Sequence, residues 1–202
     1  MKLNKKYYQQ KDVVFLAKDL IGKVIYSNIN NQLVAGIIIE TEAYKGVSDK
    51  ACHAYGNNKT PRNEAMFENG GIAYVYLCYG IHYLFNIVTN TKNNPDAVLI
   101  RGIFPLEGVE TILKRRNQKK LLKNLTFGPG KVTQALAINK AHNKIDLTEN
   151  KIWIEDKGLK IPTNKIHTSP RIGVDYAGED ALLPYRFFVE WKEMKETINN
   201  RL

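Results

Sequence analysis

Hydrophobic positions along the first 44 residues change from helical spacing to strand spacing. Between Asp12 and Gly22 the apolar side chains recur on one helical face, and the glycine is a typical helix end. Lys23–Ser27 and Leu33–Tyr44 are rich in β-branched and aliphatic residues and flank the asparagine-rich turn 28–31. The pattern predicts one helix followed by two strands that are joined by this turn.

A long polar stretch separates these strands from a second β-rich region. Residues 45–71 are polar and rich in glycine, and one short helix is expected near Asn63–Phe67. A loop of this length inside a compact domain is usually functional. Ile72–Tyr79 and Ile81–Val88 follow with Gly80 between them, which predicts a β-hairpin.

The remaining chain alternates between short helices and short strands. Ala97–Ile103 is expected to be a strand, and Pro105–Lys120 a helix with a strongly basic end. Gly128–Ile138 is expected to be a helix with proline at an early position. Further short strands are expected at Lys151–Glu155, Arg171–Val174 and Arg186–Trp191. The elements predict an α+β fold with mainly antiparallel neighbouring strands.

Composition indicates one domain inside the cell. The chain has 202 residues and no linker-like stretch or internal repeat, which favours a single domain over residues 1–202. No segment approaches the roughly 18 apolar residues of a membrane span, and the first residues lack the apolar core of a signal peptide. We therefore expect a soluble intracellular protein.

The charge balance favours a polyanionic partner. Thirty lysines and arginines stand against twenty acids, a net charge of +10. Nucleic acid and an acidic membrane surface both fit this charge, and an incidentally basic protein is the alternative. The basic side chains gather in the run Lys114–Lys123, where a solvated helix face explains them equally well. Gly128–Lys131 at a helix start offers backbone N–H groups to a phosphate, although many such turns bind nothing.

Two carboxylates follow the buried-looking strand 33–44. Side chains alternate along a strand, so Ile38, Glu40, Glu42 and Tyr44 share one face. A strand that emerges at the surface with solvated acids accounts for this pattern. A carboxylate beside apolar residues at a strand end is also a plausible general base.

The expected hairpin is unusually aromatic. Tyr74 and Tyr76 share one strand face, and a packed core explains such residues without any function. Tyr79 is different, because it lies at the tip beside Gly80, where side chains are usually wet. An exposed ring on a rigid hairpin can wedge between stacked bases. Cys52 and His53 are a weak indication of a metal, because no CxxC pair accompanies them.

Taken together, these residues resemble the alkyladenine (3-methyladenine) DNA glycosylases of the mammalian type, in a bacterial form. The ordered similarity covers about residues 15–190 and is weaker over 140–168. The matching strings include Glu40–Tyr44, Thr60–Asn63, Tyr74–Gly80, Val98–Arg101 and Gly128–Lys131, and it is their ordered series, not any one string, that is specific.

The resemblance implies a role for each matching residue. Glu42 is then the general base that directs water, and Asn86 lies at the floor of a pocket that screens purines. The walls that grip an extruded base are Tyr44, His53 and Tyr76.

Two more roles follow from the same resemblance. Arg101 matches an arginine near the extruded nucleotide and the water, and Tyr79 matches the hairpin residue that enters the minor groove. The implied fold is a single mixed domain around a curved antiparallel sheet with a protruding hairpin.

The implied activity is excision of alkylated or deaminated purines, such as 3-methyladenine or hypoxanthine, which leaves an abasic site. It requires no metal and no organic cofactor. The expected partner is double-stranded DNA that contains damaged purines, with no membrane involved. We expect a monomer in the bacterial cytoplasm, associated with the nucleoid through DNA binding.

Two other functions fit parts of the sequence. A carbohydrate glycoside hydrolase would use Glu40 and Glu42 as its acid–base pair, but it has no use for the basic charge. A module that binds damaged DNA without cutting it would leave an acid on a pocket face unexplained.

Overall fold

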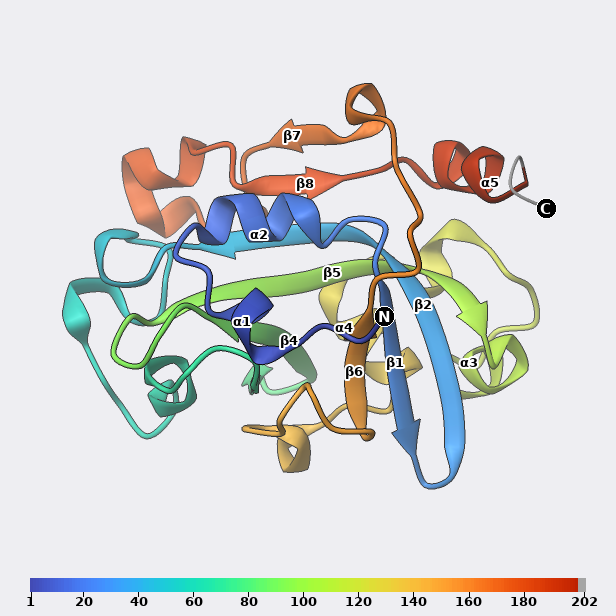
Figure 1. Cartoon of the computed structure of the whole chain (residues 1–202), viewed down its shortest axis with the longest axis horizontal. Coiled ribbons are helices and arrows are strands. Elements are labelled where there is room, and N and C mark those ends of the chain that lie inside the picture. Colours follow the sequence, from blue (N-terminus) through green and yellow to red (C-terminus); the bar gives the residue numbers. More distant parts are fainter. Residues whose placement is uncertain (200–202) are drawn as a thin grey trace.

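An antiparallel sheet of eight strands runs through the computed structural model, which describes residues 1–199 (Figure 1). The strand order is β3-β4-β5-β2-β1-β6, and β8 pairs with both β2 and β7. The strands are β1 (Val24–Ile29), β2 (Gln32–Tyr44), β3 (Ala73–Cys78), β4 (His82–Thr89), β5 (Asp96–Glu107), β6 (Ile152–Glu155), β7 (His167–Ser169) and β8 (Arg186–Phe188). The α+β class predicted from the sequence is confirmed.

Strand β2 organises this sheet. One of its edges pairs with β5 along most of its length, while the other edge pairs first with β1 and then, over Glu40–Glu42, with β8. The register between β2 and β5 shifts at three points, and such bulges bend a strand. The sheet therefore curls into an open half-barrel, in which β2 bends from the direction of β8 to that of β1 (Figure 1).

Five short α-helices accompany the sheet within residues 1–199. They are α1 (Lys5–Tyr8), α2 (Val13–Asp19), α3 (Val109–Arg115), α4 (Pro129–Ala135) and α5 (Trp191–Asn199). Asp12 caps α2 by accepting a hydrogen bond from the Phe15 amide at 2.9 Å. Proline occupies the first turn of α4, as predicted. Helix α2 packs against β2, and α4 packs against β4 and β5.

Short 3-10 segments fill much of the connecting chain. They are Gly46–Ser48, Tyr55–Asn57, Glu64–Phe67, Lys123–Leu125, Lys140–His142, Thr163–Lys165 and Asp175–Leu182. The short helix expected near Asn63–Phe67 is therefore confirmed in 3-10 form. Among residues 1–199, no helix is both long and apolar enough to cross a membrane.

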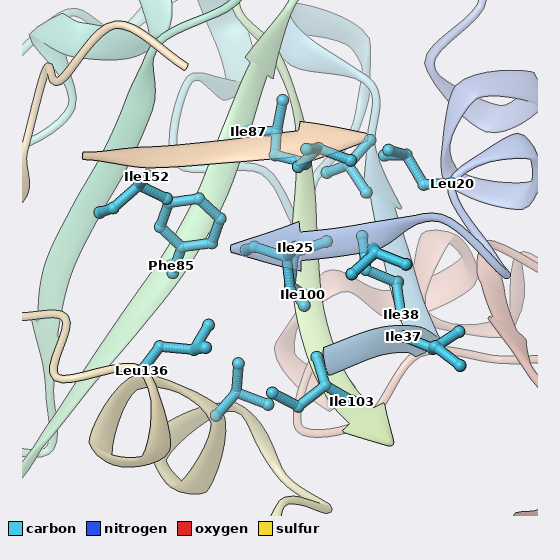
Figure 2. Packing of buried hydrophobic residues seen from close by; sticks show 14 of the residues in the cluster. Leu20, Ile25, Ile37, Ile38, Phe85, Ile87, Ile100, Ile103, Leu136 and Ile152 are labelled. Atoms are coloured by element: carbon cyan, nitrogen blue, oxygen red, sulfur yellow. The ribbon is translucent and has the colours of Figure 1, made fainter. Parts of the chain in front are cut away.

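The hydrophobic core lies between the concave sheet and its helices. Ile25, Ile38 and Ile100 from three neighbouring strands are fully buried, and Leu136 approaches them from the end of α4 (Figure 2). Each buried side chain of this size contributes about 1.5–3 kcal/mol to folding. This core fixes β2 and β5 against each other. The carboxyl end of β2 and the first half of β5 carry the candidate site.

The predicted helix over Pro105–Lys120 is wrong at both ends. Strand β5 continues to Glu107, which pairs with Ala35, and α3 begins only after Gly108. Gly108 has a φ of 66°, which favours glycine and separates the two elements. Helix α3 ends at Arg115, so most of the basic run is turn.

Of the short strands predicted near the carboxyl end, one is absent and another is shorter than predicted. Arg171–Val174 forms a turn whose first side chain is buried in an ion pair, and such contacts leave no periodic pattern. β8 ends at Phe188, and Trp191, which was expected to end the strand, begins α5.

Candidate active site

A cavity of about 750 Å³ opens between the β3–β4 hairpin and three loops. The loops contribute residues near 51–66, 128–131 and 172–176. Its aromatic lining comprises Tyr44, His53, Tyr74, Tyr76, Tyr79, His82 and Tyr176. The long polar loop 45–71 thus forms one side of the cavity, as its length suggested.

Glu42 lies directly behind the wall of this cavity and has no exposed surface. Its Oε1 accepts a hydrogen bond from the Ile172 amide at 2.8 Å, and its Oε2 accepts one from the Tyr44 hydroxyl at 2.8 Å. The Arg101 guanidinium lies 3.3 Å from Oε1. Tyr44, Arg101 and Ile172 all line the cavity, so Glu42 is one side chain away from its contents.

Opposing effects act on the Glu42 carboxyl. Burial raises the pKa of Glu42, whereas Arg101, the Ile172 amide and the Tyr44 hydroxyl lower it, and burial prevails. A raised pKa together with a position at a cavity wall is typical of a general base.

Glu40 belongs to the same buried network. Its Oε1 accepts hydrogen bonds from Arg101 Nε at 3.1 Å and from Arg186 Nε at 2.7 Å. The register of β2 with β5 shifts on both sides of Glu40, at the level of Gly102. Arg101 therefore lies between two carboxylates. The sequence predicted that Glu40 and Glu42 share a strand face, but it did not predict the arginine between them.

An ion pair holds the turn that supplies the Ile172 amide. Arg171 donates to both carboxylate oxygens of Asp49, at 2.5 and 2.9 Å, and to the Ala43 carbonyl at 3.0 Å. Its guanidinium also lies 4.9 Å from the centre of the Tyr44 ring. Asp49, Arg171 and Ile172 were not predicted as site residues, because no spacing in the sequence links a loop acid to an arginine 122 positions away.

The structure brings together the predicted wall and floor residues. His53 Nδ1 lies 2.9 Å from the Tyr74 hydroxyl, and its ring meets Tyr76 edge-on at 4.7 Å. Burial and the nearby Arg62 lower the pKa of His53, so its imidazole is neutral near pH 7. Asn86 donates from Nδ2 to the Tyr74 carbonyl at 3.1 Å and lines the cavity.

Tyr79 occupies the tip of the hairpin, as predicted, at the mouth of the same cavity. Its side chain is 88% exposed, and its φ of 49° is rare for a residue other than glycine or asparagine. Gly80 follows with a φ of 71°, which completes a tight turn between β3 and β4. An exposed aromatic ring in a strained conformation is unusual for a purely structural residue.

Basic side chains surround the cavity. Arg62 lies over the Tyr76 ring at 5.2 Å, and Arg116 and Lys131 line the cavity. Within the basic run, Arg115 and Arg116 are tied to α4 through Ala135 and Gln134. In contrast, Lys119 and Lys120 are exposed to solvent.

Nearby potential metal ligands do not converge. Among residues 1–199, no group of three histidine, cysteine or acidic side chains is arranged to hold a metal ion. Cys52 is buried, and burial raises the pKa of its thiol to about 12, so it stays protonated. The site is instead suited to a flat, electron-poor ring, with aromatic faces around it and a carboxylate to stabilise positive charge.

Comparison with known proteins gives one consistent result. Residues 6–193 match the family described as methylpurine-DNA glycosylase. A protein of Chlamydia felis named "Putative 3-methyladenine DNA glycosylase" is 47% identical over 195 residues, which cover 96% of this chain and 99% of the relative. Proteins of the same name from Desulfitobacterium hafniense and Clostridium acetobutylicum are 40% identical over 94% of this chain and 95% of each relative.

Proposed function

Since the chain belongs to the methylpurine-DNA glycosylase family, we propose that it removes alkylated purines from DNA by hydrolysing the N-glycosidic bond. The single observation that carries this proposal is the buried Glu42 behind an aromatic cavity rimmed by basic side chains. We take residues 1–202 as one glycosylase domain and bacterial DNA, in the cytoplasm at the nucleoid, as its place of action.

The chemistry begins with extrusion of the damaged nucleotide, because its glycosidic bond is inaccessible inside a duplex. Extrusion costs roughly a few kcal/mol, and stacking on an aromatic side chain returns about 1–3 kcal/mol per base. Tyr44, His53 and Tyr76 would grip the extruded base. An alkylated purine such as 3-methyladenine carries positive charge, which strengthens its attraction to these rings.

Glu42 then supplies the catalytic carboxylate. In its ionised form it accepts a proton from water that attacks the sugar carbon, while the electron pair of the broken bond leaves with the base. Glycosidic cleavage develops positive charge on the sugar, which a nearby carboxylate stabilises. Arg101, which contacts Glu42 and lines the cavity, would hold the water and the nucleotide backbone. The product is an intact strand with an abasic site.

Asn86 and Tyr79 complete the proposed roles. Asn86 would select among purines by their exocyclic groups, and deaminated purines such as hypoxanthine are the second substrate class to test. Tyr79 would enter the minor groove and fill the space that the extruded base leaves in the stack. We further propose that one copy of the chain acts alone on double-stranded DNA, without a cofactor.

A panel of duplexes, each with one defined lesion, tests the function directly. Release of free base, followed by alkali cleavage at the abasic site, is expected for 3-methyladenine. Tight lesion binding without release would support a binding-only protein instead. Hydrolysis of chromogenic sugars would support a glycoside hydrolase, although Glu40, one of the two acids that such an enzyme would use, does not line the cavity.

A further inference from the structure

The second buried acid of the site has no place in the reaction proposed above. Glu40 is 1% exposed and is absent from the cavity lining, yet it contacts Arg101, which also binds Glu42. A buried carboxylate is costly unless its partners compensate it fully. The structure provides those partners, which indicates that the position of Glu40 matters to the arginine between the two acids.

Arg186 is the other partner of Glu40, and several contacts fix it. Strand β8 pairs with β2 so that Arg186 lies opposite Glu42. Its Nη1 donates to Ser169 Oγ at 2.9 Å, and its guanidinium lies 4.3 Å from the centre of the Phe188 ring. Its Nε is thereby directed at the same Glu40 oxygen that Arg101 contacts.

Gly102 makes room for this arrangement. A Cβ atom at Gly102 would lie 3.1 Å from Glu40 Cβ and 3.3 Å from Glu40 Oε2, closer than ordinary van der Waals contact. The register shifts beside Glu40 occur at the same place. The backbone of β2 and β5 is thus shaped around the Glu40 carboxylate.

We propose that Glu40 and Arg186 are positioning residues that hold Arg101 against Glu42 and balance the charge around the catalytic carboxylate. This inference rests on the proposed function for the role of Glu42. The chain Arg186–Glu40–Arg101–Glu42 alternates in sign, so each charge has an opposite neighbour. Removal of the Glu40 charge and removal of the Arg186 charge both change the electrostatic potential at Glu42, but in opposite directions.

The other charged and polar groups that face Glu42 are not substituted in these variants. They are Tyr44 from β2, the Ile172 amide and Arg171 from the turn after β7, and Arg101 from β5. In Glu40→Gln a negative neighbour is lost, so the pKa of Glu42 falls. In Arg186→Met two carboxylates share Arg101 alone, so the pKa of Glu42 rises.

Base release measured against pH in single-turnover experiments tests this pair. A general base works only when ionised, so activity is lost as pH falls through the pKa of Glu42. The acid limb is the low-pH part of the profile, where activity falls. We expect its midpoint to shift to lower pH by about one unit in Glu40→Gln and to higher pH by about one unit in Arg186→Met. The double variant should return close to the wild-type limb, because both charges of the outer pair are gone.

Lys23→Met is the matched control for loss of a largely buried cation. The Lys23 side chain is 11% exposed and pairs with Asp19 and Asp156, whereas the Arg186 side chain is 14% exposed. The acid limb of the pH profile of Lys23→Met should coincide with that of the wild type. If the role of Arg186 is purely structural, Arg186→Met and Lys23→Met should give the same result. Both would then have lower activity, with the acid limb of the pH profile at its wild-type position.

The carboxyl ¹³C chemical shift of Glu42, followed against pH, measures the same displacements without any substrate. Shifts in one common direction, or none, would overturn the positioning role even in an active enzyme. Absence of base release by the wild type would count against the proposed function instead. In that case the opposite ¹³C shifts still decide whether Glu40 and Arg186 set the charge of Glu42.

Discussion

Glu42 illustrates how hydrogen bonds and an ion pair compensate a carboxylate that is fully buried. Three groups donate to or pair with it, from β5, from the turn after β7 and from its own strand. Burial still prevails and raises its pKa, so the carboxylate retains affinity for a proton. These are the properties that a base needs if it is to take a proton from water.

Glu42→Gln should therefore lose excision while keeping lesion binding. The amide has nearly the same shape but cannot accept a proton, and loss of a general base costs about 10²–10⁴-fold in rate. Single-turnover base release and lesion-duplex binding, measured on one preparation, test this. Glu155→Gln in β6 is the control and should behave as the wild type. Near-normal release by Glu42→Gln would remove Glu42 from its proposed role.

Asp96 makes a contribution to the free energy of unfolding that decreases as pH rises, the opposite of the usual behaviour of a paired carboxylate. Its pKa is raised from 3.8 to about 6, chiefly by burial, and this difference corresponds to about 3 kcal/mol. A raised folded-state pKa contributes stability below pH 4, and this contribution is lost as pH rises towards 6. Asp96→Asn should gain stability relative to the wild type over that interval.

Urea denaturation at pH 4 and at pH 6.5 measures this effect. The difference between variant and wild type isolates Asp96 from other acids, such as Asp146, whose pKa is lowered and whose contribution has the opposite sign. An identical pH dependence in the two proteins would show that Asp96 titrates alike when folded and unfolded.

At the scale of elements, the β3–β4 hairpin carries one buried tyrosine, Tyr74, and one exposed tyrosine, Tyr79. Tyr74, on β3, is 1% exposed and packs in a small buried cluster at the cavity wall, whereas Tyr79 at the tip is almost fully exposed. This exposure excludes a position for Tyr79 in the hydrophobic core. Its wedge function stays a prediction.

Tyr79→Ala should impair extrusion without destabilising the fold. Loss of an exposed side chain changes stability by only about 0.5 kcal/mol, whereas a core aromatic costs about 3–5 kcal/mol. Excision from a well-paired lesion should fall strongly, and the deficit should shrink in single-stranded DNA, where the base is already unstacked. Tyr74→Ala is the contrasting core variant. An equal loss of activity on every substrate would argue against the wedge.

Strands and turns with strong local patterns were predictable, whereas elements defined by distant contacts were not. The β1–β2 turn was evident from its asparagines, and Asn30 and Asn31 both have positive φ. Pro105–Glu107 was assigned to a helix because its place in β5 depends on pairing with β2. Likewise, Arg171 and Arg186 reach the site only through the fold, so no spacing in the sequence could identify them.

At the scale of the whole molecule, part of the positive charge lies at the cavity. Arg62, Arg116 and Lys131 belong to its lining, and the exposed Lys119 and Lys120 lie on the turn that follows α3. The net charge of +10 thus includes a basic rim beside the proposed lesion site. Such a rim suits contacts with phosphates on either side of an extruded nucleotide.

Binding to undamaged duplex should therefore weaken steeply as salt rises, because lysine and arginine contacts release counterions from phosphates. Lys119→Gln and Lys120→Gln should each reduce the slope of log K against log[salt] by about one if that lysine touches a phosphate. Lys160→Gln, exposed and outside the cavity lining, is the control. A flat salt dependence of the wild type would contradict nucleic acid as the partner.

The wide sequence separation within the Glu42 network has a consequence for the synthesis of the protein. Ile172 and Arg186 contact acids that precede them by 130 and 146 positions. Contacts between such distant residues form slowly, and a chain is made from its amino terminus onward. On the ribosome, β1, β2 and β5 can pair long before the segment that carries Arg186 exists. The nascent chain thus acquires a partly assembled sheet early, but its carboxylates become fully partnered only in one late step.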